Sequence, residues 1–292
     1  MIQIRHSRLS LASLLSAAIF ALLSVLAPPA AAGERLTVVA WAPGYPGTTE
    51  QAQPSMDELA SGVAVEMGIP LDEVAAYYHP ELDLGRERLL GDDVAIAIVP
   101  LPVLLEYGAE LKMRPLLTVE LAGVEQERWS LVAKKGALAS AADLSGWRLE
   151  GLAGYSPTFV RAVLSDWGTL PADVEIAFNG RVVSVLRKAA KGERLVALLD
   201  EAQAGALDRL PFAADLEVLT QSGAVPSSYV CVVGDRLTDV RTAQVTKALL
   251  ALNDSERGRE LLSTIRVDRF GQLDADASRA LETIRSQWRA LR

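Results

Sequence analysis

The sequence feature that most limits the fold is the alternation of short apolar runs with segments of helical spacing. Leu36–Trp41 is a β-branched run, and Val94–Val99 and Leu195–Leu199 are apolar at every position. Continuous apolar runs this short are typical of strands buried on both faces of a parallel sheet. Residues 54–67 instead carry apolar side chains at helical spacing and are followed by Gly68, a common helix stop. This alternation predicts an α/β fold.

The expected elements form the same unit twice: strand, loop, helix, strand, helix and apolar strand. The unit occurs before residue 125 and again after about residue 145, and no Pro-, Gly- or Ser-rich linker separates the copies. We therefore expect two similar lobes joined by crossing strands near 129–134 and 228–233. The expected strands are 36–41, 74–79, 94–99, 116–121, 129–134, 147–152, 174–178, 195–199, 216–219 and 229–233. The expected helices are 54–67, 82–90, 100–107, 156–167, 181–191, 201–209, 239–252, 255–264 and a polar helix from 275.

The first 32 residues have the pattern of a secretory leader. Arg5 and Arg8 precede an apolar stretch over residues 9–26, and small residues follow up to Gly33. A basic start, an apolar middle and an A-x-A ending are the parts of a signal peptide, and we expect cleavage after Ala32. Because an apolar stretch of about 18 residues just reaches across a bilayer, an anchor retained in the membrane is the alternative.

The composition excludes several classes of protein. A hydrophobic fraction of 50% is ample for a packed core, and 29 basic against 37 acidic residues argue against a nucleic-acid partner. Two histidines and one cysteine supply no Cys/His zinc site and no disulfide framework. Past the leader His79 is the only histidine, and it stands before Pro80 where a strand is expected to end. We therefore expect no enzyme, no metal and no cofactor.

Three further motifs favour structural roles. Asp92 with Asp93, and Glu125 with Glu127, lack the spacing of a Ca²⁺ loop or a glycosidase pair, and we interpret them as solvated faces or helix caps. The lone Cys231 lies in an apolar strand and is interpreted as a small buried hydrophobe. A thiolate contact to a soft ligand is the alternative reading of that cysteine.

Five segments follow one another in an order that resembles a known family. They are Val38–Thr49 after the leader, Leu90–Ile96 with its Gly-Asp-Asp step, Ser140–Gly146 with the form Ser-x-x-Asp-Leu-x-Gly, Tyr155–Thr158, and Ser222–Pro226 with the form Ser-x-x-x-Pro. In this order the chain resembles periplasmic solute-binding proteins of the phosphate/phosphonate-binding family of ABC importers. The resemblance covers essentially all of the chain after residue 32.

The resemblance implies the two-lobed type 2 periplasmic-binding-protein fold, each lobe a mixed sheet flanked by helices. Residues 33–128 and 229–292 would form lobe 1, and residues 129–228 lobe 2. It also implies a periplasmic protein, monomeric in solution, that closes on a small phosphate- or phosphonate-like oxyanion. The partner would be the membrane permease of an ABC transporter.

Two loops are the candidates for the ligand site. Open α/β sheets bind ligands at the carboxyl ends of their strands, which favours the loop after the first strand. A helix N-terminus collects unpaired N–H groups and suits an oxyanion, which favours the helix expected to start after Ser156 and Pro157. Helix capping alone is the alternative role for that serine. The expected ligand-binding residues are Trp41, Tyr45, Thr48, Thr49, Tyr155, Ser156 and Thr158.

Other functions stay open at this point. A periplasmic sensor or accessory protein that signals to a sensor kinase would use the same closure. An enzyme on a similar fold and a purely structural protein are the remaining alternatives. A fold by itself does not select among them, so the chemistry of the site has to.

Overall fold

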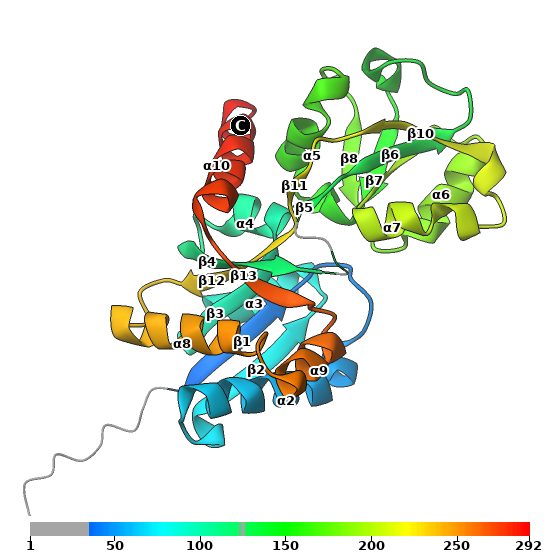
Figure 1. Cartoon of the computed structure of the whole chain (residues 1–292). Coiled ribbons are helices and arrows are strands. Elements are labelled where there is room, and N and C mark those ends of the chain that lie inside the picture. The colour runs from blue at the N-terminus through cyan, green and yellow to red at the C-terminus, as the bar shows by residue number, and fades with distance from the viewer. Residues whose placement is uncertain (1–34, 122, 124–125) are drawn as a thin grey trace, which may run out of the picture. The chain divides into compact units, whose positions relative to one another are not determined.

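The computed structural model describes residues 35–121, 123 and 126–292, and Arg35–Arg292 form one compact unit (Figure 1). The expected signal peptide, residues 1–32, lies outside the described residues, as does Glu125. Within the described part of the chain, no helix is both long enough and apolar enough to cross a membrane.

The first sheet has six strands and mixed direction. In spatial order they are β13 (Arg269–Gln272), β4 (Met113–Glu120), β12 (Ser228–Val233), β3 (Val94–Pro100), β1 (Leu36–Trp41) and β2 (Val74–His79). β1 pairs in parallel with β2 and β3, whereas β12 runs antiparallel between β3 and β4. The central strands are therefore buried on both faces, which explains their continuous apolar sequence.

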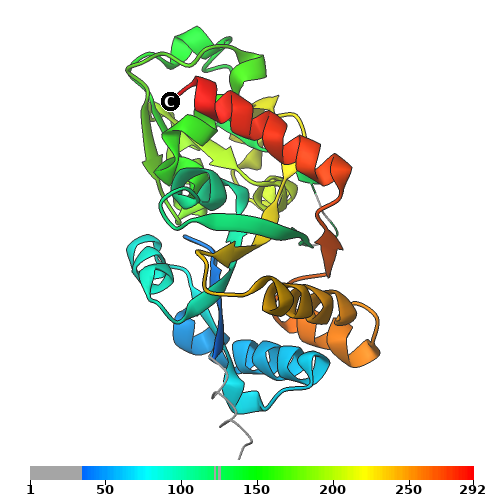
Figure 2. The same ribbon diagram turned by 90° about the vertical axis from the view of Figure 1, so that its left-hand side faces the viewer.

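Five helices accompany this sheet. They are α2 (Thr49–Met67), α3 (Leu82–Leu90), α4 (Leu101–Tyr107), α8 (Asp239–Ala251) and α9 (Glu256–Thr264). α2 packs on β2 and also contacts α8 and α9, so one face of the sheet is covered by these three helices (Figures 1 and 2). Their apolar sides share a buried cluster with the sheet that includes Leu59, Val63 and Leu249.

The second sheet has five strands in the order β10 (Leu216–Gln221), β6 (Ser130–Lys134), β9 (Leu195–Leu199), β7 (Arg148–Gly151) and β8 (Glu175–Phe178). β7 is parallel to β8 and β9, and β6 is antiparallel to β9 and β10. The helices α5 (Pro157–Val163), α6 (Val182–Ala190) and α7 (Glu201–Gly205) accompany it. Short 3-10 helices lie at Leu71–Glu73, Ala141–Leu144, Leu152–Tyr155, Ser165–Trp167, Leu207–Arg209 and Ala213–Asp215.

The chain passes between the two sheets through a small third sheet. β5 (Gln126–Glu127) pairs antiparallel with β11 (Val225–Pro226), directly before β6 and β12. The expected fold class is thus confirmed: a two-lobed α/β protein with a mixed sheet in each lobe and two crossover strands. The residue limits expected for the lobes stay a prediction. The C-terminal helix α10 (Ala275–Ala290), expected in lobe 1, packs against α5 and β11 (Figure 2).

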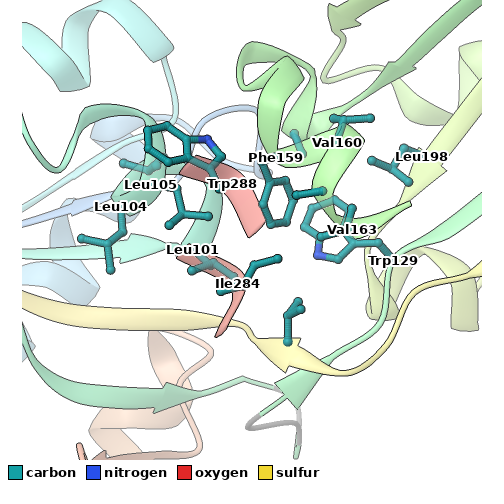
Figure 3. Packing of buried hydrophobic residues seen from close by; sticks show 14 of the residues in the cluster. Leu101, Leu104, Leu105, Trp129, Phe159, Val160, Val163, Leu198, Ile284 and Trp288 are labelled. Atoms are coloured by element: carbon teal, nitrogen blue, oxygen red, sulfur yellow. The ribbon is translucent and has the colours of Figure 1, made fainter. Parts of the chain in front are cut away.

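The main hydrophobic cluster includes residues from α4, α5 and α10. Phe159 of α5 and Leu101 of α4 are fully buried, and Ile284 and Trp288 of α10 belong to the same cluster (Figure 3). The Trp129 ring meets Phe159 edge-on at 5.4 Å between centroids. Apolar packing of this kind, rather than ion pairs, holds α10 in place.

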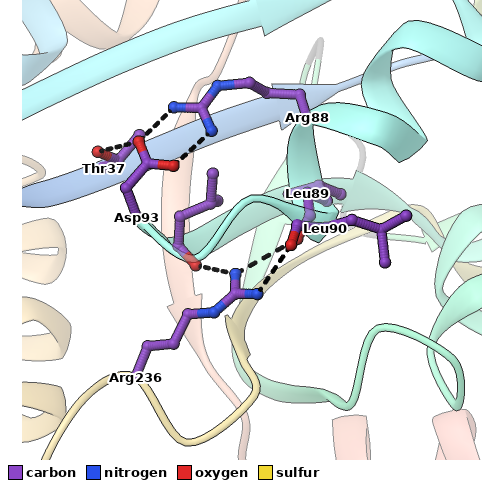
Figure 4. Close-up of polar contacts among 7 residues, drawn as sticks. Thr37, Arg88, Leu89, Leu90, Asp93 and Arg236 are labelled. Atoms are coloured by element: carbon purple, nitrogen blue, oxygen red, sulfur yellow. Dashed lines mark hydrogen bonds and ion pairs between the residues drawn. The ribbon is translucent and has the colours of Figure 1, made fainter.

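Arginine side chains stabilise the turn that leads into β3. Arg88 forms a two-pronged ion pair with Asp93, at 2.8 and 2.6 Å, across the turn between α3 and β3 (Figure 4). Arg236, from the loop after β12, donates to three backbone carbonyls, those of Leu89, Leu90 and Val94. These carbonyls include the unpaired ends of α3, so a single guanidinium stabilises the helix C-terminus.

The structure corrects several expected boundaries. The helix expected over 54–67 begins at Thr49, because the Thr48 hydroxyl accepts from the Gln51 N–H and starts the helix about one and a half turns earlier. The helix expected over 156–167 ends at Val163 and continues only as a 3-10 turn. The strand β13 was not expected, because its sequence Arg-Phe-Gly-Gln has no apolar run.

Candidate functional site

The loop after β1, residues 42–47, extends from the first sheet to the second lobe. The Gly44 N–H donates to the Pro80 carbonyl at 2.8 Å. Gly44 has a φ of +78°, and a Cβ at this position would lie 2.6 Å from Leu152 and 2.9 Å from Phe178. Both the backbone conformation and the close approach therefore require glycine here. We call the region where the two lobes meet the lobe junction. Its residues are Gly44, Tyr45, Glu106, Tyr107, Glu127, Leu152, Tyr155, Ser156, Phe178 and Asp200.

Tyr45, the residue after Gly44, also contacts the second lobe. Its ring packs against the hydrophobic cluster of the second sheet, which includes Leu152 and Leu199. Asp200 directly follows the last residue of β9 and is 3% exposed. It is the N-cap of α7, where its side chain accepts from the Gln203 N–H at 2.8 Å. Burial raises the pKa of Tyr45 well above its usual value, and the Asp200 carboxyl raises it further.

Glu127 lies beside Asp200 at the first crossover. The antiparallel pairing of β6 with β9 brings the end of β5 next to the start of α7, and the Arg128 N–H donates to Glu201 there at 2.8 Å. Glu127 is 8% exposed. Burial raises the pKa of Glu127 well above the usual carboxyl value, and Asp200 and Glu201 add to the rise. The indole of Trp129 opposes this shift in part. The interpretation of Glu127 as a solvated or capping residue was wrong, because the side chain is buried beside Asp200 and Glu201.

Glu106 of α4 is the third carboxyl residue of the junction. The Ser156 hydroxyl donates to Glu106 Oε2 at 2.8 Å, joining the end of α4 to the start of α5. Ser156 is fully buried and makes no capping hydrogen bond of its own to α5. Pro157 is the first residue of α5 and has no N–H. The serine expected to hold an oxyanion therefore donates its hydrogen bond to the Glu106 carboxyl.

Four aromatic rings form a row through the junction. Trp41 of β1 lies 5.1 Å from Tyr107 of α4, Tyr107 lies 6.3 Å from Tyr155, and Tyr155 lies 5.8 Å from Phe178 of β8. All three pairs are tilted or edge-on, so faces as well as edges of the rings are presented to neighbours. Burial raises the pKa of Tyr155, and the carboxyls of the junction raise it further.

Trp41 is held in this row by a glycine. The indole is fully buried, and its N–H donates to the Glu81 carbonyl at 3.2 Å. A Cβ on Gly85 of α3 would lie only 2.1 Å from the indole ring. Trp41 thus contacts α3 at Gly85 and also packs against Tyr107, the next ring of the row.

The start of α2 carries its own negative charge. Thr48 caps the helix, and the Gln51 side chain accepts from the Thr48 N–H in return. A backbone hydrogen bond at the helix start, followed by one from the Thr48 hydroxyl, lowers the pKa of Glu50. Of the N–H groups at the start of α2, that of Glu50 is therefore used by its own carboxylate and that of Gln51 by the Thr48 hydroxyl.

The structure brings together some of the expected ligand-binding residues. Tyr45, Tyr155 and Ser156 lie at the lobe junction. Trp41 packs against Tyr107, which in turn packs against Tyr155. Thr48 and Thr49 form the start of α2, and Thr158 is half-buried in the first turn of α5. Contact of any of them with a ligand stays a prediction.

The sequence reading missed Glu106, Asp200 and Phe178 at this site. Asp200 had a signal, because it directly follows an all-apolar strand, where parallel sheets place functional groups. Glu106 and Phe178 had none, since no motif or periodicity in α4 or β8 distinguishes either residue. Cys231 is fully buried on β12, and this burial raises the pKa of its thiol, as expected of a small core residue.

The two mixed sheets joined by two crossover strands form the two-lobed fold of periplasmic binding proteins. Residues 39–278 match the family model described as ABC transporter, phosphonate, periplasmic substrate-binding protein. The chain belongs to this family, whose members are periplasmic substrate-binding proteins of transporters rather than enzymes. A comparison with curated proteins gave no match.

Solved structures share the fold at low identity. XAC2383 from Xanthomonas citri, bound to ATP, has a TM-score of 0.70 and 15% identity over 89% of this chain and 98% of its own. A binding protein component of an ABC phosphonate transporter from Pseudomonas aeruginosa has a TM-score of 0.61 and 15% identity over 89% of both chains. PhnD1 from Prochlorococcus marinus, in complex with methylphosphonate, has a TM-score of 0.63 and 12% identity over 88% of this chain and 98% of its own.

Proposed function

We propose that this protein binds a small solute at the lobe junction and presents it to the permease of an ABC importer. The observation that carries the proposal is the contact between the loop after β1 and the residues Leu152 and Phe178 of the other lobe. A solute that replaces such contacts couples its binding to the closure of the lobes. The family relation supports the permease as the partner.

The ligand expected from the sequence is a phosphate- or phosphonate-like oxyanion. The family relation supports this class, and Ser156 and Thr158 would supply hydroxyls once Ser156 turns away from Glu106. Burial raises the pKa of Glu127 and of Asp200, which favours their neutral forms, and a neutral carboxyl does not repel an oxyanion.

The test is a thermal unfolding and calorimetric titration of the purified protein with solutes of both signs. A ligand that binds only the folded state stabilises it by about 2.7 kcal/mol at a hundredfold excess over its Kd. Stabilisation by a small solute, together with stimulation of the permease ATPase by the loaded protein, is the expected result. Binding without any effect on the permease would favour the alternative role as a sensor that signals to a kinase.

We further propose that the protein is secreted by the segment 1–32 and works as a monomer. The basic, apolar and small-residue parts of that segment support secretion. Mass spectrometry of the secreted protein should give a chain that starts at Gly33, and a retained N-terminus would support the anchored alternative. Sedimentation of the same sample tests the monomer.

A further inference from the structure

Two consecutive residues at the end of α4 meet two consecutive residues that precede α5. Glu106 accepts from the Ser156 hydroxyl at 2.8 Å, and the Tyr107 and Tyr155 rings lie 6.3 Å apart between centroids. α4 directly follows β3 of the first sheet, whereas α5 is followed by β8 of the second. These contacts therefore join the two lobes by side chains, in addition to the crossover strands. We call the four residues, Glu106, Tyr107, Tyr155 and Ser156, the α4–α5 clasp.

The clasp is positioned by two packed helices. Leu104 and Leu105 of α4 and Phe159 and Val160 of α5 are buried in the same hydrophobic cluster (Figure 3). The two helices also contact each other directly. Side chains carried by closely packed helices have little freedom to move apart, so the interior packing fixes the hydrogen bond of the clasp.

The hydrogen bond of the clasp uses a donor that an oxyanion would need. A serine hydroxyl has one proton to donate, and Glu106 accepts from that of Ser156. A phosphate or phosphonate oxygen that bound there would have to accept the same proton. The first position of α5 offers no backbone substitute, because Pro157 has no N–H. The Glu106 carboxyl and an oxyanion therefore compete for one hydroxyl.

Glu106 has no cation to hold its carboxyl elsewhere. Arg86 of α3 forms its ion pair with Glu110, four residues further along the chain. Within residues 35–121, 123 and 126–292, no lysine or arginine forms an ion pair with Glu106. A ligand that takes the Ser156 hydroxyl leaves this half-buried carboxyl without its donor, which weakens the net binding of the ligand.

We propose that Glu106 sets the affinity of the lobe junction for oxyanions, as an internal competitor that engages the Ser156 hydroxyl whenever no ligand does. This inference rests on the proposed function, because it concerns the same site and the same ligand class. On binding, the hydroxyl turns from Glu106 Oε2 to an oxygen of the phosphate or phosphonate. On release, Glu106 accepts from the hydroxyl again, which favours transfer of the solute to the permease.

Calorimetric titration of the purified protein with methylphosphonate and with phosphate tests the inference. Glu106→Ala removes the competing acceptor and should tighten the binding of at least one of these anions by roughly tenfold or more, the effect of one hydrogen bond. Glu106→Gln keeps an acceptor oxygen and should gain less. Ser156→Ala removes the contested hydroxyl, so that adding it to Glu106→Ala should cancel most of the gain. This non-additivity separates competition for one hydroxyl from a change in packing.

Asp83→Ala is the matched control. Asp83 is an exposed carboxyl residue of α3 that also interacts electrostatically with Tyr107, but Ser156 donates to Glu106 instead. This variant should bind both anions as the parent does. An equal gain in Asp83→Ala would attribute the effect to net charge and overturn the inference.

Two other results also contradict the inference. If the parent binds an anion and Glu106→Ala binds it equally or more weakly, Glu106 is no competitor, while the proposed function stands. If neither protein binds methylphosphonate or phosphate, the inference is overturned, and the proposed function is then decided by the other solutes of its own titration.

Discussion

Replacing Gly85 by alanine tests how Trp41 is held behind the lobe junction. The new Cβ would lie 2.1 Å from the Trp41 ring, more than 1 Å inside ordinary contact, and the ring is fully buried with Tyr107 on its other side. The indole must therefore move, and its hydrogen bond to the Glu81 carbonyl must lengthen or break.

The expected cost follows from three contributions. Overpacking costs about 1–3 kcal/mol, and the strained hydrogen bond costs about 1 kcal/mol. Alanine regains about 1 kcal/mol through its higher helix propensity. The net loss of stability is about 2 kcal/mol, which lowers the Tm by about 4–8 °C in a chain of this size.

Differential scanning calorimetry at constant pH measures the effect. The matched control is Gly205→Ala, because Gly205 ends the helix α7 and a Cβ added there would meet no atom within 4 Å. That variant should be as stable as the parent or slightly more stable. If Gly85→Ala unfolds at the same temperature as Gly205→Ala, the close packing of Trp41 on α3 does not hold and the reasoning is refuted.

Three further predictions concern the junction and the core. Because the folded pKa of Glu127 is raised, its contribution to stability is greatest at acidic pH and is lost as the pH rises through that pKa. The stability of Glu127→Gln relative to the parent, measured by urea unfolding, should therefore increase from pH 5 to pH 8. Ser156→Ala leaves Glu106 without its donor and should cost about 1 kcal/mol in the same assay; an unchanged midpoint argues against that contact. Cys231 should react with a thiol reagent only on unfolding, and fast labelling of the native protein would contradict its burial.

Much of the fold was predictable from local patterns. β2 and α3 have the expected limits, because a proline or a glycine follows each of them, and β9 does because its run of five residues is apolar throughout. The expected helix starts were less accurate: α2 begins at Thr49, where a capping box outweighs the proline further along. The strand β13 forms only because β4 offers it an edge, which no local signal reveals.

The sequence by itself determined the alternation of strands and helices and the buried character of Cys231. Only the tertiary structure placed Glu127 next to Asp200 and Ser156 next to Glu106. These partners are separated by 73 and 50 positions along the chain, and a carboxyl beside a turn looks solvated until another segment covers it. Periodicity reports which face of an element is buried, whereas the electrostatics of a site depend on which distant segments share it.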